Sequence, residues 1–312
     1  MDLSTELKGR DFISLHDFTR AEISLIIDTA MGLKKELKSG ILHPYLAGKT
    51  LGMIFQKSST RTRVAFEVGM YQLGGHALFL SPRDIQLGRG ESIKDTALVL
   101  SRMLEGIMIR TFSHDEVLEL AKWADIPIIN GLTDLLHPTQ VIGDMQTITE
   151  YKGGVEGIKL AFVGDGNNVA HSLLFGGAKM GMHVSIACPP GYEPDAGVLR
   201  LAEEDARQSG ARLSVVHDPL VAVEGADVVY TDVWASMGQE GEAAEKEQHF
   251  MQYQVNKRLM SVAHKDAIVL HCLPAKRGKE ITDEVLDGPQ SAVFDEAENR
   301  LHAHKAIMAL VM

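Results

Sequence analysis

The sequence predicts an α/β protein of two domains, each a parallel β-sheet flanked by helices, with further helices joining the domains. Short apolar runs alternate with helical patterns along the whole chain, which is typical of parallel sheets. The length of 312 residues suits about two domains. The stretch Lys152-Gly153-Gly154 interrupts this series near its middle. We therefore expect domains over 1–150 and 151–295, followed by a last helix over about 296–312.

The first domain is expected to begin with a helix over 17–38, where apolar residues recur at helical spacing and lysines precede Gly40. Four short apolar runs predict strands at 51–56, 77–80, 107–110 and 127–130. Helices are expected between and after these strands, at 61–73, 92–103, 116–123 and 138–151.

The second domain repeats this alternation. Strands are expected at 159–163, 183–187, 213–216, 228–231 and 268–271, because each range is a short apolar run. One clear helix follows the first of them, at 168–180, and the segments between the later strands are expected to be helices or loops.

Composition narrows the classes of function. The chain has 31 basic and 42 acidic residues and a net charge of −11, which has the wrong sign for a general nucleic-acid binder. A small anionic substrate would therefore need a locally basic pocket. Two distant cysteines, Cys188 and Cys272, fit a reducing compartment better than a disulfide framework. We see no targeting segment or bilayer-spanning apolar run and expect a cytoplasmic protein.

Polar residues gather where the predicted strands end, which is where open α/β sheets bind their ligands. In the first domain they are Ser59-Thr60-Arg61-Thr62-Arg63, Arg110 and His137-Pro138-Thr139-Gln140. Hydroxyls, backbone N–H groups and a guanidinium at a helix start predict a phosphate or carboxylate site. An ordinary N-cap would account for one hydroxyl only, so we favour anion binding. There is no Walker A motif, and a nucleotide triphosphate is not implied.

Arg110 and His137 are ambiguous when each is considered alone. Arg110 could be a second oxyanion donor or a charge reaching water, and His137 could be a loop histidine bonded to backbone. Because His137 is expected on the same rim as Arg61, we favour a role for it as a donor to a carbonyl oxygen. The side-chain amide of Gln140 could donate to the same oxygen.

In the second domain, Gly164-Asp165-Gly166 begins like a dinucleotide fingerprint, but Val169 stands at the third glycine position, which disfavours NAD. Asn167 and Asn168 suit an amino-acid carboxylate, unless one of them is a plain N-cap. Asp232 offers a carboxylate for an ammonium group, although its spacing fits a surface loop equally well. Cys272 is interpreted as a small buried residue, because the sequence shows no nearby base.

Four separated motifs, taken in order, resemble the aspartate/ornithine transcarbamoylase family, and its ornithine-specific members in particular. They are Ser59-Thr60-Arg61-Thr62-Arg63, His137-Pro138-Thr139-Gln140, Asp232 with Ser236-Met237-Gly238, and His271-Cys272-Leu273-Pro274. The resemblance extends from about Asp11 to the last helix.

The resemblance implies that the first domain binds carbamoyl phosphate, that the second binds L-ornithine, and that the last helix packs back onto the first domain. The residues expected at carbamoyl phosphate are Ser59, Thr60, Arg61, Thr62, Gln86, Arg110, His137, Gln140, Cys272, Leu273 and Arg300. Those expected at ornithine are Asn168, Asp232, Ser236 and Met237. Those expected to serve catalysis are Arg61, Arg110, His137, Gln140, Asp232 and Cys272. The family forms homotrimers with active sites at subunit interfaces, and Gln86 is expected to reach the site of a neighbouring subunit.

The implied reaction moves the carbamoyl group to the side-chain amine of ornithine and yields citrulline and phosphate, as part of arginine metabolism. This chemistry requires no metal or organic cofactor, and we expect neither, nor a nucleic-acid or membrane partner. Two alternatives stay open: another amine, such as putrescine or acetylornithine, or a non-catalytic relative that binds the anion only. A nucleotide-dependent oxidoreductase is the weakest alternative, because the third fingerprint glycine is missing.

Overall fold

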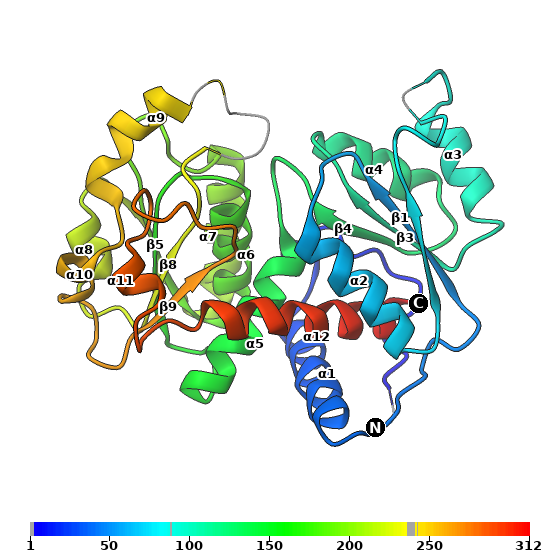
Figure 1. The fold of residues 1–312 in the computed structure, drawn as a ribbon, viewed down its shortest axis with the longest axis horizontal. Coiled ribbons are helices and arrows are strands. Elements are labelled where there is room, and N and C mark those ends of the chain that lie inside the picture. The colour runs from blue at the N-terminus through cyan, green and yellow to red at the C-terminus, as the bar shows by residue number, and fades with distance from the viewer. Residues whose placement is uncertain (1–2, 88, 236–240, 242) are drawn as a thin grey trace. The chain divides into compact units, whose positions relative to one another are not determined.

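The computed structural model describes residues 3–87, 89–235, 241 and 243–312. The chain forms two compact units, one of Met1–Gln146 with Glu298–Met312 (unit 1) and the other of Thr147–Ala297 (unit 2). Each unit contains one parallel sheet with helices around it (Figure 1). The division falls inside two helices, α5 (Pro138–Lys152) and α12 (Val293–Val311).

Unit 1 is built on four parallel strands in the order β2-β1-β3-β4. They are β1 (Thr50–Phe55), β2 (His76–Leu80), β3 (Gly106–Arg110) and β4 (Ile128–Leu132). The helices are η1 (Leu15–Asp17), α1 (Arg20–Lys38), α2 (Thr60–Gln72), α3 (Ile93–Leu100) and α4 (His114–Trp123), with the adjoining parts of α5 and α12.

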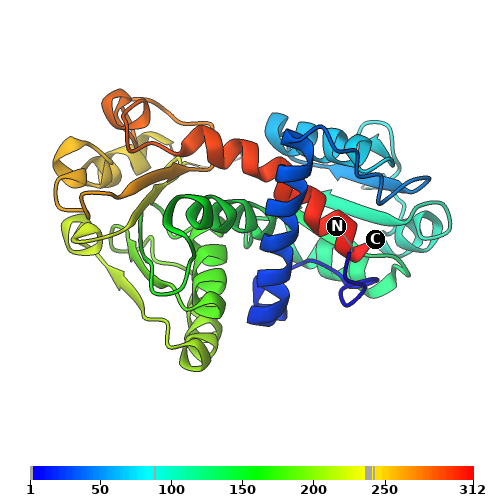
Figure 2. The same cartoon turned by 90° about the horizontal axis from the view of Figure 1, so that it is seen from below.

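The start of α1 is fixed by a capping box. The Thr19 side chain accepts from the backbone N–H of Glu22, and the Glu22 carboxylate accepts from the backbone N–H of Thr19 at 2.7 Å. Figure 2 shows α1 crossing α12. At this crossing Lys34 Nζ donates to Asn299 Oδ1 at 2.8 Å, so the C-terminal part of α12 belongs to unit 1 by its contacts.

Unit 2 has five parallel strands in the order β7-β6-β5-β8-β9. They are β5 (Lys159–Val163), β6 (His183–Ala187), β7 (Leu213–Val216), β8 (Val228–Thr231) and β9 (Ile268–His271). The helices are α6 (Asn168–Met180), α7 (Ala196–Ser209), α8 (Pro219–Val223), α9 (Ala243–Phe250), η3 (Met251–Tyr253), α10 (Lys257–Met260) and α11 (Asp283–Leu286).

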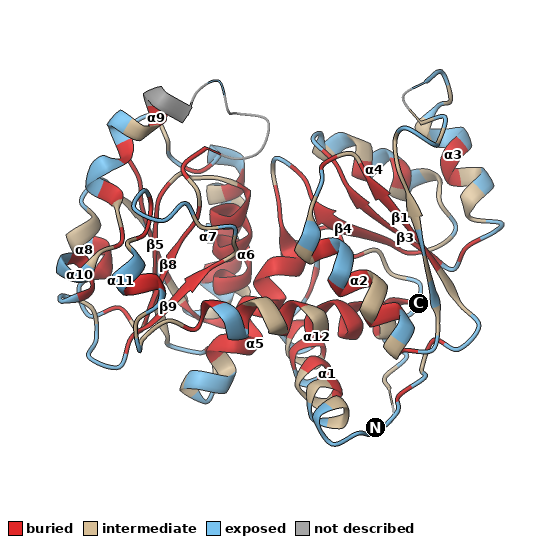
Figure 3. Cartoon of the chain, viewed as in Figure 1, coloured by how far each residue is buried: buried red, intermediate tan, exposed pale blue. Residues whose placement is uncertain are grey.

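Four strands, β3, β4, β8 and β9, are buried along their whole length, as expected for parallel sheets covered on both faces (Figure 3). In unit 2 the rings of Phe162 and Tyr230 stack with their centroids 5.7 Å apart. The Tyr230 hydroxyl donates to Glu296 Oε1 at 3.1 Å, which satisfies the one polar atom of a fully buried ring.

The predicted α/β class and all nine predicted strands are confirmed in the described residues. The five strands of unit 2 and α6 have the predicted bounds, whereas the strands of unit 1 are shifted by one or two residues. Three helix ends were predicted wrongly by three residues: α1 begins at Arg20 instead of 17, α3 ends at Leu100 instead of 103, and α12 begins at Val293 instead of 296. Among the described helices, none is long and apolar enough to cross a bilayer.

We expect Gly177→Ala to destabilise unit 2, because α6 lies close to β6 at this point. A Cβ on Gly177 would lie 2.4 Å from Val184 Cγ2, a buried side chain with little room to move. Such overpacking should lower the free energy of unfolding by about 1–3 kcal/mol, as measured by urea denaturation. Gly154→Ala is the control, because a Cβ there would meet nothing within 4 Å. Equal stabilities of the two variants would contradict this account of the packing.

Candidate active site

The carboxyl ends of β1, β3 and β4 lie side by side in unit 1, because these strands are parallel neighbours. The register places Phe55 opposite Arg110, and Arg110 opposite Leu132. The backbone N–H of Gln56 donates to the carbonyl oxygen of Arg110 at 2.8 Å. The segments that follow these three strands therefore start from one edge of the sheet, as the sequence predicts.

The first segment leads into α2. Ser59 caps this helix: its Oγ accepts from the backbone N–H of Thr62 and donates to Thr62 Oγ1 at 3.0 Å. Thr62 is fully buried, Arg61 is half-buried and Thr60 is exposed. The N-cap interpretation is thus correct for Ser59, and it leaves Arg61 at the positive end of the helix.

Arg63 does not belong with these residues. Its side chain is exposed, its Nε donates to Glu67 Oε1 at 2.9 Å one helical turn later, and its guanidinium lies 3.8 Å from the centroid of the Phe79 ring. The alternating arginines of the motif therefore separate into one residue at the helix end and one on the helix surface.

His137 is close enough to several basic residues of unit 1 for their charges to act on it. Its side chain is 4% exposed. Burial, and after it the charges of Arg300 and Arg110, hold the pKa of His137 well below its usual range, with smaller contributions from His304 and Arg61. The imidazole is therefore neutral at pH 7, and we name the three surrounding guanidinium groups of Arg61, Arg110 and Arg300 the cation cluster.

Arg300 comes from α12, more than 230 residues after the β1 segment. Its Nη2 donates to Thr62 Oγ1 at 2.7 Å. Helices α12 and α5 lie close together at Gly143, where a Cβ would be in van der Waals contact, 3.4 Å from both the Arg300 Cγ and its backbone nitrogen. The structure thus brings together Arg300 and Thr62, two residues that were both predicted for the carbamoyl phosphate site.

Two buried residues of this region have no place among the predicted site residues. Asp144, one turn after Gln140 on α5, accepts from Gln140 Nε2 at 2.8 Å. His304 is fully buried and stacks on Phe66 with the ring centroids 4.2 Å apart. Spacing alone could have indicated Asp144, because residues four apart on a helix are neighbours.

Gln86 lies apart from these residues in the described structure. It belongs to the segment between β2 and α3, and its side chain is exposed. Its carbonyl oxygen accepts from the backbone N–H of Arg89 at 2.7 Å. The expected role of Gln86 in a neighbouring subunit stays a prediction.

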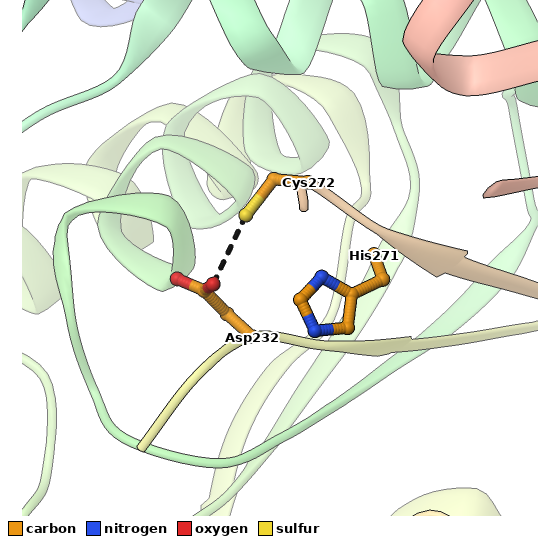
Figure 4. Close-up of side chains that lie close together, drawn as sticks. All are labelled: Asp232, His271 and Cys272. Atoms are coloured by element: carbon orange, nitrogen blue, oxygen red, sulfur yellow. Dashed lines mark hydrogen bonds between the residues drawn. The ribbon is translucent and has the colours of Figure 1, made fainter. Parts of the chain in front are cut away.

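Asp232 is the centre of the polar group in unit 2. It follows β8 directly and is 7% exposed. Its Oδ1 accepts from Cys272 Sγ at 3.1 Å and from the backbone N–H of Val233 at 2.8 Å, and its Oδ2 accepts from Asn167 Nδ2 at 2.8 Å. Figure 4 shows Cys272 and Asp232 pointing toward one another from two neighbouring strands. The surface-loop interpretation of Asp232 is therefore wrong.

The two asparagines that precede Val169 have different positions. Asn167 is the N-cap of α6, and its Oδ1 accepts from the backbone N–H groups of Val169 and Ala170. Asn168 is the first helical residue and is 9% exposed. The alternative of a plain N-cap thus applies to Asn167 and not to Asn168, whose expected role at the ligand stays a prediction.

The turn after β9 is held by a buried pair. His271 Nδ1 accepts from the backbone N–H of Leu273 at 2.9 Å, so Nε2 carries the proton that faces Glu280 Oε1 at 3.0 Å. Both side chains of this pair are fully buried. Leu273 has a backbone φ of +56°, a conformation that costs a leucine about 1–3 kcal/mol. The pair fixes the backbone next to Cys272.

A metal could in principle use donors from this turn. Ligand atoms of Asp232, His271 and Cys272 lie within 4.8 Å of one another, an arrangement that the sequence spacing does not reveal. Binding there would have to displace the hydrogen bonds of His271 and Asp232 described above. Ser236 and Met237, which were also predicted for unit 2, lie outside the described residues.

An ion pair lies beside the glycine turn of unit 2. Lys246 Nζ, on α9, is 2.6 Å from Asp165 Oδ2, and both side chains are largely buried. Burial raises the pKa of Asp165, and the hydrogen bond and charge of Lys246 oppose that shift. The turn between β5 and α6 is therefore anchored on the side of Asp165 as well as on that of Asn167.

Comparisons with known proteins agree with this arrangement. The family model for the carbamoyl-P binding domain of aspartate/ornithine carbamoyltransferases matches residues 10–150, and the model for the Asp/Orn binding domain matches residues 156–311. The chain belongs to the aspartate/ornithine carbamoyltransferase family. The predicted resemblance is thus confirmed.

The most similar carbamoyltransferases include proteins with full-length coverage. The ornithine carbamoyltransferase of Symbiobacterium thermophilum is 62% identical over 99% of both chains. An ornithine carbamoyltransferase of Pyrococcus furiosus described as anabolic is 56% identical over 98% of this chain and 97% of its own. The solved structure of an ornithine carbamoyltransferase from Pyrococcus furiosus matches with a TM-score of 0.96 and 56% identity, over 98% of both chains.

The family match and the structure divide the carbamoyltransferase chain differently near its C-terminus. The Asp/Orn binding domain match runs to residue 311, whereas the contacts of residues 298–312 place them in unit 1. Arg300 lies in this segment, so a residue within the second family match takes part in the polar group of unit 1.

We expect this carbamoyltransferase to lose stability steeply below about pH 6.5, because several of its histidines are buried as neutral groups. Burial lowers the pKa of His302 to about 3 and holds those of His137 and His304 well below the usual range. Below pH 6.5 the unfolded chain protonates these histidines while the folded chain does not. Each should contribute about 1.4 kcal/mol of lost stability per pH unit.

Urea unfolding at several values between pH 5 and 7 measures this slope. His302→Gln should make the slope shallower by about 1.4 kcal/mol per pH unit. His76→Gln is the control, since His76 is exposed on β2 and should leave the slope unchanged. An unchanged slope in His302→Gln would show that His302 already binds a proton in the folded chain.

Proposed function

We propose that this carbamoyltransferase transfers the carbamoyl group of carbamoyl phosphate to the side-chain amine of L-ornithine, which yields L-citrulline and phosphate. The groups around Asp232 are the observation that favours ornithine as the second substrate. Among the residues that the structure describes, the hydrogen-bond donors to its carboxylate, from Asn167, Val233 and Cys272, are uncharged. A buried negative charge with neutral donors suits a ligand with an ammonium group, whereas aspartate would bring a second carboxylate and require cations.

The phosphate group is proposed to bind at the start of α2. Backbone N–H groups and the helix dipole favour an anion there, and Arg61 and Arg300 supply positive charge. Ser59, Thr60 and Thr62 supply hydroxyl groups at the same helix end. Each charge-assisted hydrogen bond to phosphate is worth about 1.5–3 kcal/mol.

The carbonyl oxygen of the carbamoyl group is proposed to face His137, Arg110 and Thr62. A neutral imidazole keeps one N–H for donation and does not add a fourth positive charge to the cation cluster. Negative charge develops on this oxygen as the amine attacks the carbon. Removing one such donor typically raises the barrier by about 2.7–4 kcal/mol.

Ornithine is proposed to bind in unit 2, with an ammonium group at Asp232 and its carboxylate at Asn168. Ser236 and Met237 are proposed as further ligands on the basis of the family resemblance, and Cys272 and Leu273 as the lining of the reacting amine. The attacking amine must lose a proton first. With a lysine-like pKa of about 10.4, this costs roughly 4.6 kcal/mol at pH 7.

We propose that the chain assembles as a homotrimer in the cytoplasm, with Gln86 completing a neighbouring site. Exposed apolar side chains support self-association: Tyr71 is 80% exposed on α2, and Leu78 is 41% exposed on β2, the edge strand of its sheet. Both cysteines are free, and burial raises the pKa of Cys188 to about 12, which suits a reducing compartment.

A colorimetric citrulline assay with several amines tests the proposed function. Carbamoyl phosphate is supplied with ornithine, aspartate, acetylornithine or putrescine in parallel. We expect turnover with ornithine to exceed that with each other amine by at least about a hundredfold, because an analogue that leaves buried polar groups unpaired is rejected strongly. Equal or faster turnover of another amine would contradict the choice of ornithine, and binding of carbamoyl phosphate without any turnover would indicate a non-catalytic relative.

Two substitutions should separate the substrates. Arg61→Ala is expected to raise the KM for carbamoyl phosphate at least tenfold, since it removes a charge-assisted donor. Asp232→Asn is expected to raise the KM for ornithine by a similar factor and to leave the Kd of carbamoyl phosphate within about twofold. Arg63→Ala is the matched control for Arg61, because Arg63 pairs with Glu67 on the helix surface. Near-normal kinetics in both test variants would refute the assignment of substrates to units.

A further inference from the structure

Glu116 lies in the first turn of α4 and contacts the ends of two strands in unit 1. Its Oε2 accepts one hydrogen bond from Gln56 Nε2 at 3.0 Å and another from Thr111 Oγ1. Gln56 is the first residue after β1, and Thr111 is the first residue after β3. One carboxylate oxygen therefore joins the ends of two neighbouring parallel strands, and we name Glu116, Gln56 and Thr111 the strand-end clasp.

The start of α4 does not by itself explain where the Glu116 carboxylate points. Ser113 and Glu116 have the spacing of a capping box, in which both side chains bond to the first turn of the helix. Thr19 and Glu22 form such a box on α1. Ser113 is the N-cap of α4 but makes no side-chain hydrogen bond to it in the described structure, and the Glu116 carboxylate bonds to the strand ends instead.

The strand-end clasp is adjacent in the chain to two groups of proposed site residues. Arg110 directly precedes Thr111, and Gln56 stands three residues before Ser59, the N-cap of α2. The backbone N–H groups of Gln56 and Lys57 donate to the carbonyl oxygen of Arg110 at 2.8 and 3.4 Å. The clasp adds side-chain bonds to this backbone contact, so a shift of Arg110 relative to the end of β1 would have to break bonds of both kinds.

The same turn of α4 also contacts the segment that leads to His137. His114 Nδ1 lies 3.1 Å from Thr133 Oγ1, and this oxygen accepts from the backbone N–H of Leu136 at 3.1 Å. Leu136 directly precedes His137. The first turn of α4 thus contacts the segments at the ends of β1, β3 and β4, and each of them carries or leads to proposed site residues.

The proposed site needs these strand ends in a fixed relation to one another. The phosphate group is proposed to bind at the start of α2, whereas the carbonyl oxygen is proposed to face Arg110 and His137. One small ligand therefore contacts groups carried by different strands, and its binding depends on the distances between those groups. Inorganic phosphate, in contrast, needs only the start of α2.

We propose that Glu116 is a positioning residue whose carboxylate fixes Arg110 relative to the start of α2, so that one carbamoyl phosphate molecule fits both. This inference rests on the proposed function and deepens it. Glu116 acts through Gln56 and Thr111 and has no assigned contact with the substrate.

The test uses two ligands in the absence of ornithine. Phosphonoacetamide is a stable analogue that carries both a phosphonate and a carbamoyl group, and inorganic phosphate lacks the carbamoyl group. The spanning ratio is the Kd of inorganic phosphate divided by the Kd of phosphonoacetamide, both measured by calorimetry. A change at the phosphate subsite alone affects both constants equally and cancels in this ratio. A loss of stability that moves no site residue also leaves the ratio unchanged.

We expect Glu116→Met to lower the spanning ratio at least about tenfold, because displacement of a site group by about 1 Å costs up to about a hundredfold. The Kd of inorganic phosphate should stay within about twofold, and kcat should fall while the KM for ornithine stays unchanged. An unchanged ratio, or equal weakening of both ligands, would overturn the proposal.

Two further variants separate position from charge. Glu116→Gln keeps an oxygen that can accept from both Gln56 and Thr111, so the spanning ratio should stay within about twofold of the wild-type value. A ratio as low as that of Glu116→Met would show that the lost charge matters, and would overturn the proposal. Glu119→Met is the matched control, because Glu119 is exposed on the same helix, and it should keep the wild-type ratio. A fall in this control would count equally against the proposal.

Thr111→Val keeps the inference testable even if Glu116→Met does not fold. Valine has a similar shape to the fully buried threonine but cannot donate to Glu116, so the spanning ratio should fall at least about threefold. The double variant should have the ratio of Glu116→Met alone, because Thr111 has then already lost this partner. An unchanged ratio in Thr111→Val, or a further fall in the double variant, would contradict the proposed route.

The wild-type measurement separates this inference from the proposed function. If wild-type protein binds phosphonoacetamide no more tightly than inorganic phosphate, the proposed carbamoyl phosphate site is wrong. If the wild-type ratio is high and Glu116→Met does not change it, the positioning role of Glu116 alone is refuted.

Discussion

Burial of positive charge is the constraint on which much of unit 1 depends. Arg110 and Arg300 are nearly inaccessible to water and Arg61 is half-buried, so their mutual repulsion is weakly screened. The histidines and the hydroxyl group next to these arginines add no further positive charge. His137 and His304 are held neutral, and Arg300 donates to a neutral hydroxyl at Thr62. A dianionic ligand at this cluster would offset the excess of positive charge.

Unit 2 follows the opposite electrostatic pattern. Asp232 is surrounded by neutral donors, and the one buried cation described near the glycine turn, Lys246, is already paired with Asp165. Unit 1 thus buries guanidinium groups in its polar group, whereas unit 2 buries a carboxylate in its own.

Local patterns predicted most of the fold. Buried parallel strands are short apolar runs with clear ends, so the bounds of β5 to β9 could be predicted to the residue. Helix ends were harder to predict, because α12 is buried around much of its length and lacks a sharp polar boundary at Val293. The short helices α8, α10 and α11 escaped individual prediction because four or five residues carry little periodicity.

The site was predicted where it depends on strand ends and missed where it depends on packing. Ser59, Arg110 and His137 follow adjacent strands, so their common edge follows from topology alone. No local rule brings His304 beside Phe66, because that contact joins segments far apart in the chain. The sequence also could not show that Arg61 and Arg63 have different surroundings. Their spacing does not say which of the two side chains has a partner on the helix surface.

The C-terminal segment also has a consequence for biosynthesis. Residues 298–312 belong to unit 1, Met312 is buried, and its carbonyl oxygen accepts from Lys49 Nζ. Unit 1 is therefore assembled from two stretches of the chain that are separated by the whole of unit 2. During synthesis Arg300 can reach Thr62 only after residues 147–297 have been made, so this contact is among the late ones of unit 1.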